Sequence, residues 1–210
     1  MQEQPRPRSR RGRTPDAELA TRRSEVLDAA LAELVAVGYE RVTTEGIARR
    51  ASASKQTLYR WFGDREGIFT ALIARNGDAV AATLDVERLE GDAASILRTF
   101  ARALLRLLLG PESVALNRAA MASPELAAAL RAAGRGRVEP VMRAWLAERN
   151  RQGDLAVAAP AEAFTTLIGL VVADRQVRVL LGEKPPTEPE RDACADRGVA
   201  QFLALHAGPA

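Results

Sequence analysis

The sequence has few of the residues that build metal sites, disulfides and many catalytic centres. It contains one cysteine, Cys194, and one histidine, His206, and aromatic residues make up 4% of it. A lone cysteine excludes an internal disulfide and suits a reducing cytoplasm. One Cys and one His cannot form a zinc cluster at ligand spacing, and no Gly-rich phosphate loop or nucleophile elbow is present. We therefore expect no catalytic residue, metal site or cofactor, and no enzyme activity.

Long hydrophobic runs are also missing. No stretch of about 18 uncharged apolar residues occurs, so we expect no membrane-spanning helix and no membrane partner. The N-terminal residues are charged and no apolar segment follows them, so they do not have the pattern of a secretory signal. The sequence therefore predicts a cytoplasmic protein.

Apolar residues, mostly Ala, Leu and Val, make up 47% of the chain and recur in long periodic runs. Gly and Pro fall between these runs, a pattern typical of helices joined by turns. The basic charge is uneven, because residues 1–60 hold 12 Lys and Arg against 8 Asp and Glu, whereas the rest hold 18 against 19. The composition predicts an all-α protein whose N-terminal part attracts phosphate.

Residues 43–62, TTEGIARRASASKQTLYRWF, have the pattern of two short helices joined by a tight turn. Thr43 or Thr44 can cap the first helix, and Ser54 can cap the second by accepting a bond from a free backbone N–H. Leu58 and Phe62 are four residues apart, so they share the buried face of the second helix. Basic, hydroxyl and aromatic residues remain on its outer face, as in a helix-turn-helix that enters a DNA major groove.

A longer segment around this pattern, from Gly38 to Leu72, resembles the TetR/AcrR regulators. The shared features are Gly-Tyr, a Thr before the second helix, Ile-Ala, Ser-Lys-x-Thr-Leu-Tyr, and a Phe followed by an acidic cap that opens the fourth helix. The resemblance implies an N-terminal three-helix DNA-binding domain and a C-terminal helical domain that binds a ligand and dimerises. It also implies a double-stranded DNA operator as partner.

The resemblance assigns DNA contacts to particular residues of this chain. At the start of the second helix of the helix-turn-helix, which begins at residue 55, Lys can donate to guanine, Gln can pair with adenine, and the Thr methyl can meet a thymine methyl. A tyrosine and an arginine further along match phosphate-contacting positions, and residues at the starts of helices two and four match backbone-holding positions. The matched residues are Lys55, Gln56, Thr57, Tyr59, Arg60, Thr43, Thr44 and Arg65.

Three residues depart from the family pattern. Ser52 stands in the turn where Gly is usual, a position at which a positive φ is easiest for Gly. Gly46 and Gly67 occupy the third positions of helices two and four, and Gly in a helix costs on the order of 1 kcal/mol relative to Ala. We therefore expect a slightly loose DNA-binding unit.

The pattern divides the chain into three parts. Residues 1–13 are Pro- and Arg-rich and are predicted to be a disordered basic tail. Within it, Arg11-Gly12-Arg13 either enters a minor groove or adds only non-specific phosphate attraction. Residues 14–64 form the predicted DNA-binding domain, and residues 65–210 the effector-binding and dimerisation domain. Helices are expected near 15–37, 65–83, 92–109, 112–122, 124–133, 138–151, 161–181 and 188–205.

The last two expected helices carry many apolar residues, including Phe164, Val171 and Phe202, which suggests more apolar surface than a monomer would expose. In TetR-like proteins the last two helices pair with their copies, so the resemblance implies a homodimer through them. Residues 110–182 also resemble the AefR-type C-terminal domain. Arg98, Arg102 and Arg106 recur every four residues and are expected on a solvated face.

A helical bundle in the second domain can hold a small apolar effector between its helices. The candidates are large or adaptable apolar side chains with one polar anchor, and the competing interpretation is that they are ordinary core. They are Phe100, Leu104, Asn117, Met121, Met142, Trp145, Phe164 and Ile168.

These features predict a regulator that binds a palindromic operator as a repressor and is released by a small apolar ligand of unknown identity. Two alternatives remain open. One is a TetR-like regulator that is ligand-independent or activates transcription. The other is a helical enzyme or scaffold with an incidental helix-turn-helix.

Overall fold

The computed structural model describes residues 15–83, 85 and 90–207, so the predicted basic tail of residues 1–13 lies outside the described part of the chain. The described residues fold into helices without a named strand, as the composition predicts. None of these helices is both long and apolar enough to cross a membrane. The helices are α1 (Pro15–Val37), α2 (Thr44–Arg50), α3 (Lys55–Phe62), α4 (Arg65–Thr83), α5 (Ala93–Leu108), α6 (Pro111–Met121), α7 (Pro124–Ala133), α8 (Arg135–Gln152), α9 (Pro160–Val172), α10 (Arg175–Leu180) and α11 (Glu188–Leu205).

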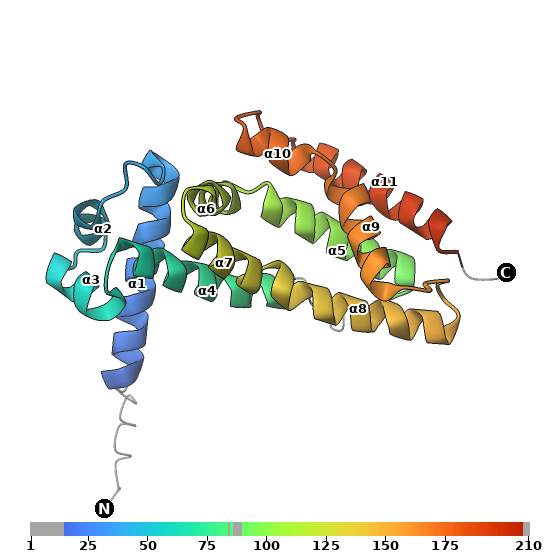
Figure 1. Ribbon diagram of the computed structural model, residues 1–210, viewed down its shortest axis with the longest axis horizontal. Helices are drawn as coiled ribbons and strands as arrows, with labels where there is room; N and C mark the ends of the chain where they lie inside the picture. The colour runs from blue at the N-terminus through green and yellow to red at the C-terminus, as the bar shows by residue number, and fades with distance from the viewer. Residues whose placement is uncertain (1–14, 84, 86–89, 208–210) are drawn as a thin grey trace, which may run out of the picture.

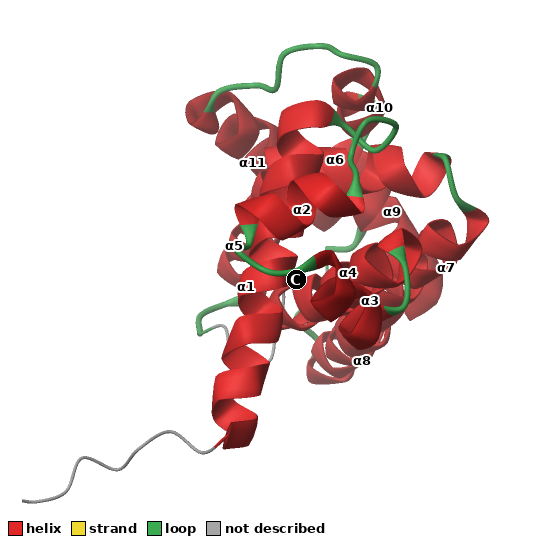
Figure 2. Cartoon of the chain, turned by 90° about the vertical axis from the view of Figure 1, so that its left-hand side faces the viewer, coloured by secondary structure: helices red, strands yellow, loops and turns green. Residues whose placement is uncertain are grey.

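The molecule is elongated, with α1, α2 and α3 at one end and α8, α9 and α11 at the other (Figure 1). Helix α4 starts beside α3 and runs from that end toward the second half, where it packs against α7. In the second half α11 packs on α5 and α9, and α8 packs on α9. Viewed from the end, α2 and α3 lie at the front of the molecule, which leaves them accessible to a large partner (Figure 2).

Two hydrophobic clusters hold this arrangement together. One joins α5, α8, α9 and α11 and includes Phe100, Phe164 and Phe202, all 2% exposed or less. The other fills the space between α1, α2, α3 and α4, but it continues into α6 and α7 through residues such as Leu116 and Leu126. Helices α1–α4 are therefore packed directly against α6 and α7. The division at residue 64 stays a prediction.

The sequence predicted most helix ends correctly because their caps are local. The expected helices at 65–83, 124–133 and 188–205 match α4, α7 and α11. The expected helix at 161–181 is wrong, because the chain breaks between α9 and α10, where Ala173 has a φ of 48°. Helix α8 also begins earlier than predicted: the break is confined to Gly134, and Arg135 is already helical.

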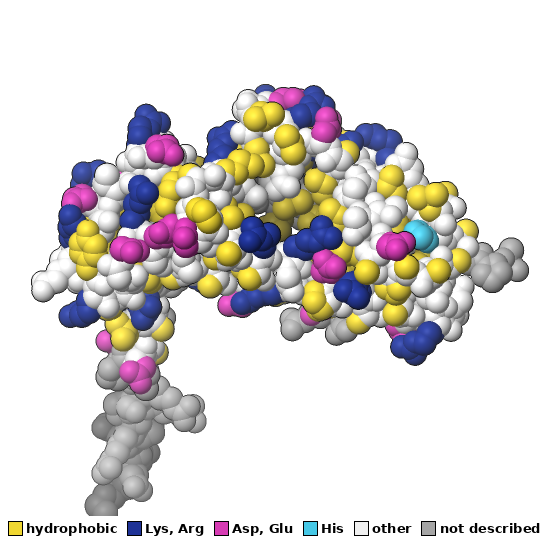
Figure 3. Space-filling model, viewed as in Figure 1, with side chains coloured by type: hydrophobic (Ala, Val, Ile, Leu, Met, Phe, Trp, Pro, Cys, Tyr) yellow, Lys and Arg dark blue, Asp and Glu magenta, His cyan; other side chains and the backbone are white. Residues whose placement is uncertain are grey.

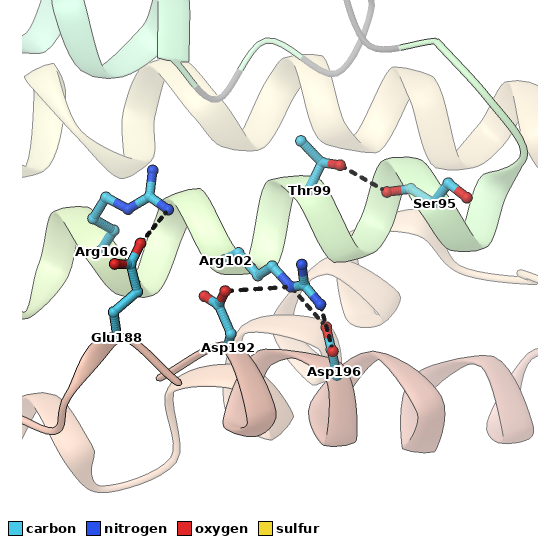
Figure 4. Close-up of polar contacts among 7 residues, drawn as sticks. All are labelled: Ser95, Thr99, Arg102, Arg106, Glu188, Asp192 and Asp196. Carbon is cyan, nitrogen blue, oxygen red and sulfur yellow. Dashed lines mark hydrogen bonds and ion pairs between the residues drawn. The ribbon is translucent and has the colours of Figure 1, made fainter. Parts of the chain in front are cut away.

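The arginine row on α5 is not merely solvated, contrary to the prediction. The Arg102 guanidinium makes two hydrogen bonds to the Asp196 carboxylate, at 3.0 and 2.6 Å, and lies 4.0 Å from Asp192. One turn along, Arg106 lies 3.4 Å from Glu188 (Figure 4). The acidic partners recur every four residues on α11, so the two rows form an ion-pair ladder that joins α5 to α11.

The apolar residues that suggested a dimer interface are largely used inside one chain. Phe164, Leu167, Val171, Val199 and Phe202 are all buried in the core of the second half. Apart from Leu205, which is 65% exposed, the positions of α9 and α11 that remain exposed carry small or polar side chains instead. They include Thr165, Gly169, Ala193, Arg197, Ala200 and Ala204. The apolar pattern therefore does not identify an interface, because these residues form the core of a single chain.

Candidate functional site

The turn between α2 and α3 is fixed by helix caps that can be predicted from the sequence. The Thr43 hydroxyl accepts a hydrogen bond from the Gly46 N–H at 3.0 Å, and the Ser54 hydroxyl accepts one from the Thr57 N–H at 3.0 Å. At the end of α2 the Ala53 N–H donates to the Ala48 carbonyl and the Ser52 N–H to the Arg49 carbonyl. This pair of bonds is a Schellman motif, whose left-handed position normally holds Gly. Ser52 occupies it with a φ of 49°.

The two helical glycines each permit a close approach between helices, and the slight looseness expected of the DNA-binding unit stays a prediction. A Cβ on Gly46 would lie 2.5 Å from an oxygen of Glu33, a carboxylate that is only 9% exposed and bonds Arg50 at 3.0 Å. A Cβ on Gly67 would lie 2.0 Å from the Phe62 carbonyl oxygen. The first glycine lets α2 pack on α1, and the second lets α4 start directly beside the end of α3.

The outer face of α3 holds most of the predicted DNA contacts. Gln56, Tyr59 and Arg60 are exposed, and Leu58 beneath them is fully buried. Among the described residues, Gln56 and Arg60 have no hydrogen-bond or ion-pair partner, so their polar groups are free to bind another molecule. Thr57 is half-buried, and its hydroxyl lies 2.8 Å from that of Ser54.

Lys55 is exposed but not free. Its ammonium group forms an ion pair with Glu45 in the first turn of α2. The same group lies 5.6 Å from the centre of the Tyr59 ring. No sequence pattern had linked Glu45 to the recognition helix.

The predicted backbone-holding residues differ from one another in the structure. Thr43 is exposed, and because its oxygen accepts the cap bond, its hydroxyl hydrogen can still be donated to a phosphate. Thr44 is buried, which keeps its side chain away from DNA. The Arg65 guanidinium stacks on the Tyr39 ring, 4.3 Å from its centre, and donates to the carbonyls of Tyr39 and Val42 at 3.3 Å. Arg65 therefore braces the loop between α1 and α2 against the start of α4.

Helix α4 is tied to its neighbours at several levels. Near its start, Glu66 accepts a hydrogen bond from the buried Ser123 hydroxyl at the α6–α7 corner. In its middle, Arg75 donates to both oxygens of Ser24 in α1 at 3.0 Å. Near its end, Asp78 forms an ion pair with Arg137 of α8. Any displacement of α4 must therefore rearrange contacts with both halves of the molecule.

The residues predicted to form an effector pocket lie mostly in solid core. Phe100, Leu104, Met142, Trp145 and Phe164 are buried, and Ile168 packs against them. Met121 points the other way and is 72% exposed. Of these predicted residues, only Asn117 lines a cavity next to α4, one of several on the described part of the molecule. That cavity gives the effector hypothesis a different location from the one predicted.

This cavity has a volume of about 290 Å³ and lies between α4, α5, α6 and α7. Figure 3 shows a hollow on this side of the molecule, with recessed hydrophobic side chains and Lys or Arg side chains at its rim. The α4 wall includes Gly77, where a Cβ would lie 2.7 Å from the Ala133 Cβ of α7. Its lining is Ile73, Asn76, Gly77, Val80, Leu107, Leu108, Glu112, Ser113, Leu116, Asn117, Leu130, Arg131, Ala133, Gly134 and Arg135.

Two amides supply hydrogen-bonding groups within the apolar lining. The Asn117 amide nitrogen donates to the Ser113 carbonyl at 2.8 Å, which leaves its own carbonyl oxygen as an available acceptor. Within the described part of the chain, Asn76 on α4 has no hydrogen-bond partner. The Arg135 guanidinium at the edge is already engaged by Glu139 at 2.8 Å. The cavity therefore offers neutral amide groups within an apolar wall, and its charged lining residues Glu112, Arg131 and Arg135 are exposed to solvent.

Family profiles match both halves of the chain. Residues 26–72 match the bacterial regulatory proteins of the tetR family, and residues 95–207 match the AefR-like transcriptional repressor C-terminal domain. A Bacillus subtilis protein, the HTH-type transcriptional regulator YvkB, is 37% identical over 67 residues. That match spans 32% of this chain and only 34% of the relative.

Solved structures of the family match nearly the whole fold. A TetR regulator from Agrobacterium tumefaciens is 37% identical with a TM-score of 0.72, over 89% of this chain and 95% of that one. The flavonoid-responsive regulator FrrA is 25% identical with a TM-score of 0.70, over 90% and 98%. A putative TetR-family regulator from Mesorhizobium loti has a TM-score of 0.80 at 24% identity, over the same shares. The chain is therefore a DNA-binding transcriptional regulator of the TetR family with an AefR-like C-terminal domain.

Proposed function

We propose that this regulator is a repressor released from a palindromic operator when a small, mostly apolar ligand occupies the cavity beside α4. The observation that carries the proposal is the position of Ile73, Gly77 and Val80. They line the cavity from the same helix that begins directly after the recognition helix. A ligand that displaces this wall must also move the start of α4, and α3 with it. The AefR-like match is to a domain of transcriptional repressors, which supports repression over activation.

The proposed release is a shift between two conformers. A ligand favours one conformer only by its differential affinity for the two. The tight contact between Gly77 and Ala133 makes α4 and α7 the parts that a ligand can separate. The contacts of Glu66 and Asp78 would then change at the two ends of α4.

The apolar wall and the two amides favour a ligand with an apolar body and one or two hydroxyl or carbonyl groups, since the charged lining residues Glu112, Arg131 and Arg135 are exposed to solvent. Asn117 offers a free acceptor and Asn76 a free amide, whereas the guanidinium of Arg135 is already paired. FrrA, whose fold matches over 90% of this chain, is responsive to flavonoids, which are flat molecules with this chemistry. We therefore propose hydroxylated aromatic compounds as the first class to test.

We propose that DNA is bound by a homodimer formed through α9 and α11. A family member that binds as a symmetric dimer presents two recognition helices about 34–36 Å apart, one helical turn of DNA. The outward faces of α9 and α11 carry small residues such as Gly169 and Ala200, which let helices approach closely. Binding should weaken steeply as salt rises, because phosphate contacts release counterions.

The test combines two measurements on the full chain. A thermal-shift screen with flavones and related phenols should raise the melting temperature by mass action. The same compounds should release a fluorescent duplex that the protein has selected from a randomised library. Asn117→Leu should reduce the response to hydroxylated compounds while leaving duplex binding intact. If compounds stabilise the protein without changing DNA affinity, or none binds at all, ligand-independent control is the better account. The position of the selected site relative to the promoter separates repression from activation.

A further inference from the structure

The ion pair between Glu45 and Lys55 connects the two helices of the DNA-binding motif at their N-terminal ends. Glu45 lies in the first turn of α2 and Lys55 is the first residue of α3. The side chains are 60% and 46% exposed, so the pair sits at the surface rather than in the core. The hydrogen bond between them lowers the pKa of Glu45 and raises that of Lys55, so both groups stay charged at neutral pH.

An exposed ion pair of this kind adds little to stability, because both charges remain solvated and are screened by salt. Its effect on DNA binding can be larger, because it restricts the position of the lysine side chain before DNA binds. A free lysine is a flexible, strongly hydrated charge that is attracted to any phosphate. Lys55 is instead held between the Glu45 carboxylate and the Tyr59 ring. An ammonium group has three donors, so it can keep the carboxylate and still donate to a guanine edge.

We propose that Glu45 is a specificity-determining residue that positions Lys55 for a base edge and keeps it from binding phosphates indiscriminately. The carboxylate acts in two ways. It orders the lysine side chain before binding, which favours a site where base acceptors match that position. It also offsets part of the Lys55 charge, which disfavours complexes in which Lys55 binds only a phosphate. The inference rests on the placement of Lys55 at a base edge, and it does not depend on ligand release.

The experiment compares Glu45→Gln with wild type on two duplexes of equal length, measured by fluorescence anisotropy at several salt concentrations. One duplex is the site that wild type selects from a randomised library, and the other is a scrambled sequence of the same composition. Glu45→Gln should bind the scrambled duplex more tightly and with a salt slope steeper by about 1. The ratio of the two affinities should fall roughly tenfold, within the range expected for one base contact.

Two controls isolate the mechanism. Glu40→Gln removes the same charge from the same end of the molecule, but Glu40 lines a groove facing Pro111 and Arg118 of α6, away from α3. It should leave the ratio unchanged. In a Lys55→Met background, which itself lowers the ratio, Glu45→Gln should have no further effect on it.

The proposal is overturned by any of four results. The first is an equal ratio of affinities for Glu45→Gln and Glu40→Gln, which would leave only the net charge as the cause. The second is equal tightening of both duplexes by Glu45→Gln, which removes the role in specificity. The third is a fall of the ratio by the same factor in the Lys55→Met background, which would make Glu45 itself the base reader. The fourth is an unchanged ratio in Lys55→Met itself, which refutes the proposal while leaving ligand release untouched.

Discussion

The turn of the DNA-binding motif carries a strain that one substitution should relieve. Ser52 sits at the left-handed position of the Schellman motif with a φ of 49°, a conformation that L residues rarely adopt. Its side chain is exposed and makes no hydrogen bond among the described residues, so removing it loses no contact. Ser52→Gly should therefore stabilise the protein.

The size of the gain follows from two opposing effects. An L residue in the left-handed region costs roughly 1–2 kcal/mol because its Cβ crowds the backbone. Glycine gives back part of this, since it adds about 0.4–1 kcal/mol of conformational entropy to the unfolded chain. We expect a net gain of about 0.5–1 kcal/mol, which corresponds to an increase in melting temperature of roughly 1–4 °C for a chain of this size.

Urea and thermal unfolding followed by circular dichroism measure this gain. Ser52→Ala is the matched control, because it removes the hydroxyl but keeps the Cβ, and it should leave stability nearly unchanged. Ala173→Gly is an independent repeat in the other half of the molecule, since Ala173 has a φ of 48° and is exposed. The reasoning fails if Ser52→Gly destabilises the protein, or if Ser52→Ala stabilises it equally.

Three further predictions concern packing and charge. Gly77→Ala should weaken operator binding, because its Cβ would lie 2.7 Å from Ala133 and push α4 from α7; anisotropy that matches wild type would contradict this. Gly46→Ala should destabilise the protein by about 1–3 kcal/mol through the clash with Glu33, as measured by urea unfolding; unchanged stability would mean that Glu33 simply moves aside. Asp196→Asn should cost about 0.5–1 kcal/mol at pH 7, discounted because both partners are about 40% exposed. The hydrogen bond from Arg102 lowers the pKa of Asp196 below its ordinary 3.8, so this stabilisation is full above that pH and is lost as the pH falls through the lowered pKa. The difference between wild type and Asp196→Asn should therefore shrink in strong acid, and a constant difference would argue against the ion pair.

The sequence predicted local features of the fold well and long-range ones poorly. Thr43 and Ser54 were recognisable as caps because a cap depends only on residues within one turn. The break at Ala173 carries no Gly or Pro, so no local rule marked it. The break between α9 and α10 can be recognised only in the folded structure.

In the candidate site, too, local features were predicted well and contacts between helices were not. Gln56, Tyr59 and Arg60 lie on the exposed face of α3 as their spacing predicts. The pairs that cross between helices were missed because sequence spacing does not say which helices meet. One signal was present: Glu188, Asp192 and Asp196 share the four-residue spacing of the arginines on α5, and matching the two rows would have predicted the ladder.

Most of the residues predicted to line an effector pocket do not reach the cavity beside α4, for a physical reason. Large apolar side chains at helical spacing mark where a core is dense, and Phe100, Trp145 and Phe164 are dense core here. A gap instead depends on how helices cross, and the crossing of α4 with α7 is set by small residues at Gly77 and Ala133. Small residues at one position carry no visible signal until their partner on another helix is known.

The account depends on the cavity beside α4 controlling DNA affinity, and filling it with a side chain tests this without a ligand. Ser113 lines the cavity, and Ser113→Trp should occupy part of its volume of about 290 Å³. Met121→Trp, at an exposed position on the same helix, is the matched control. We predict that Ser113→Trp stays folded but binds the selected duplex roughly 5–150-fold more weakly than Met121→Trp, the usual range of allosteric coupling. Equal affinities for a folded, filled variant and its control would contradict the account.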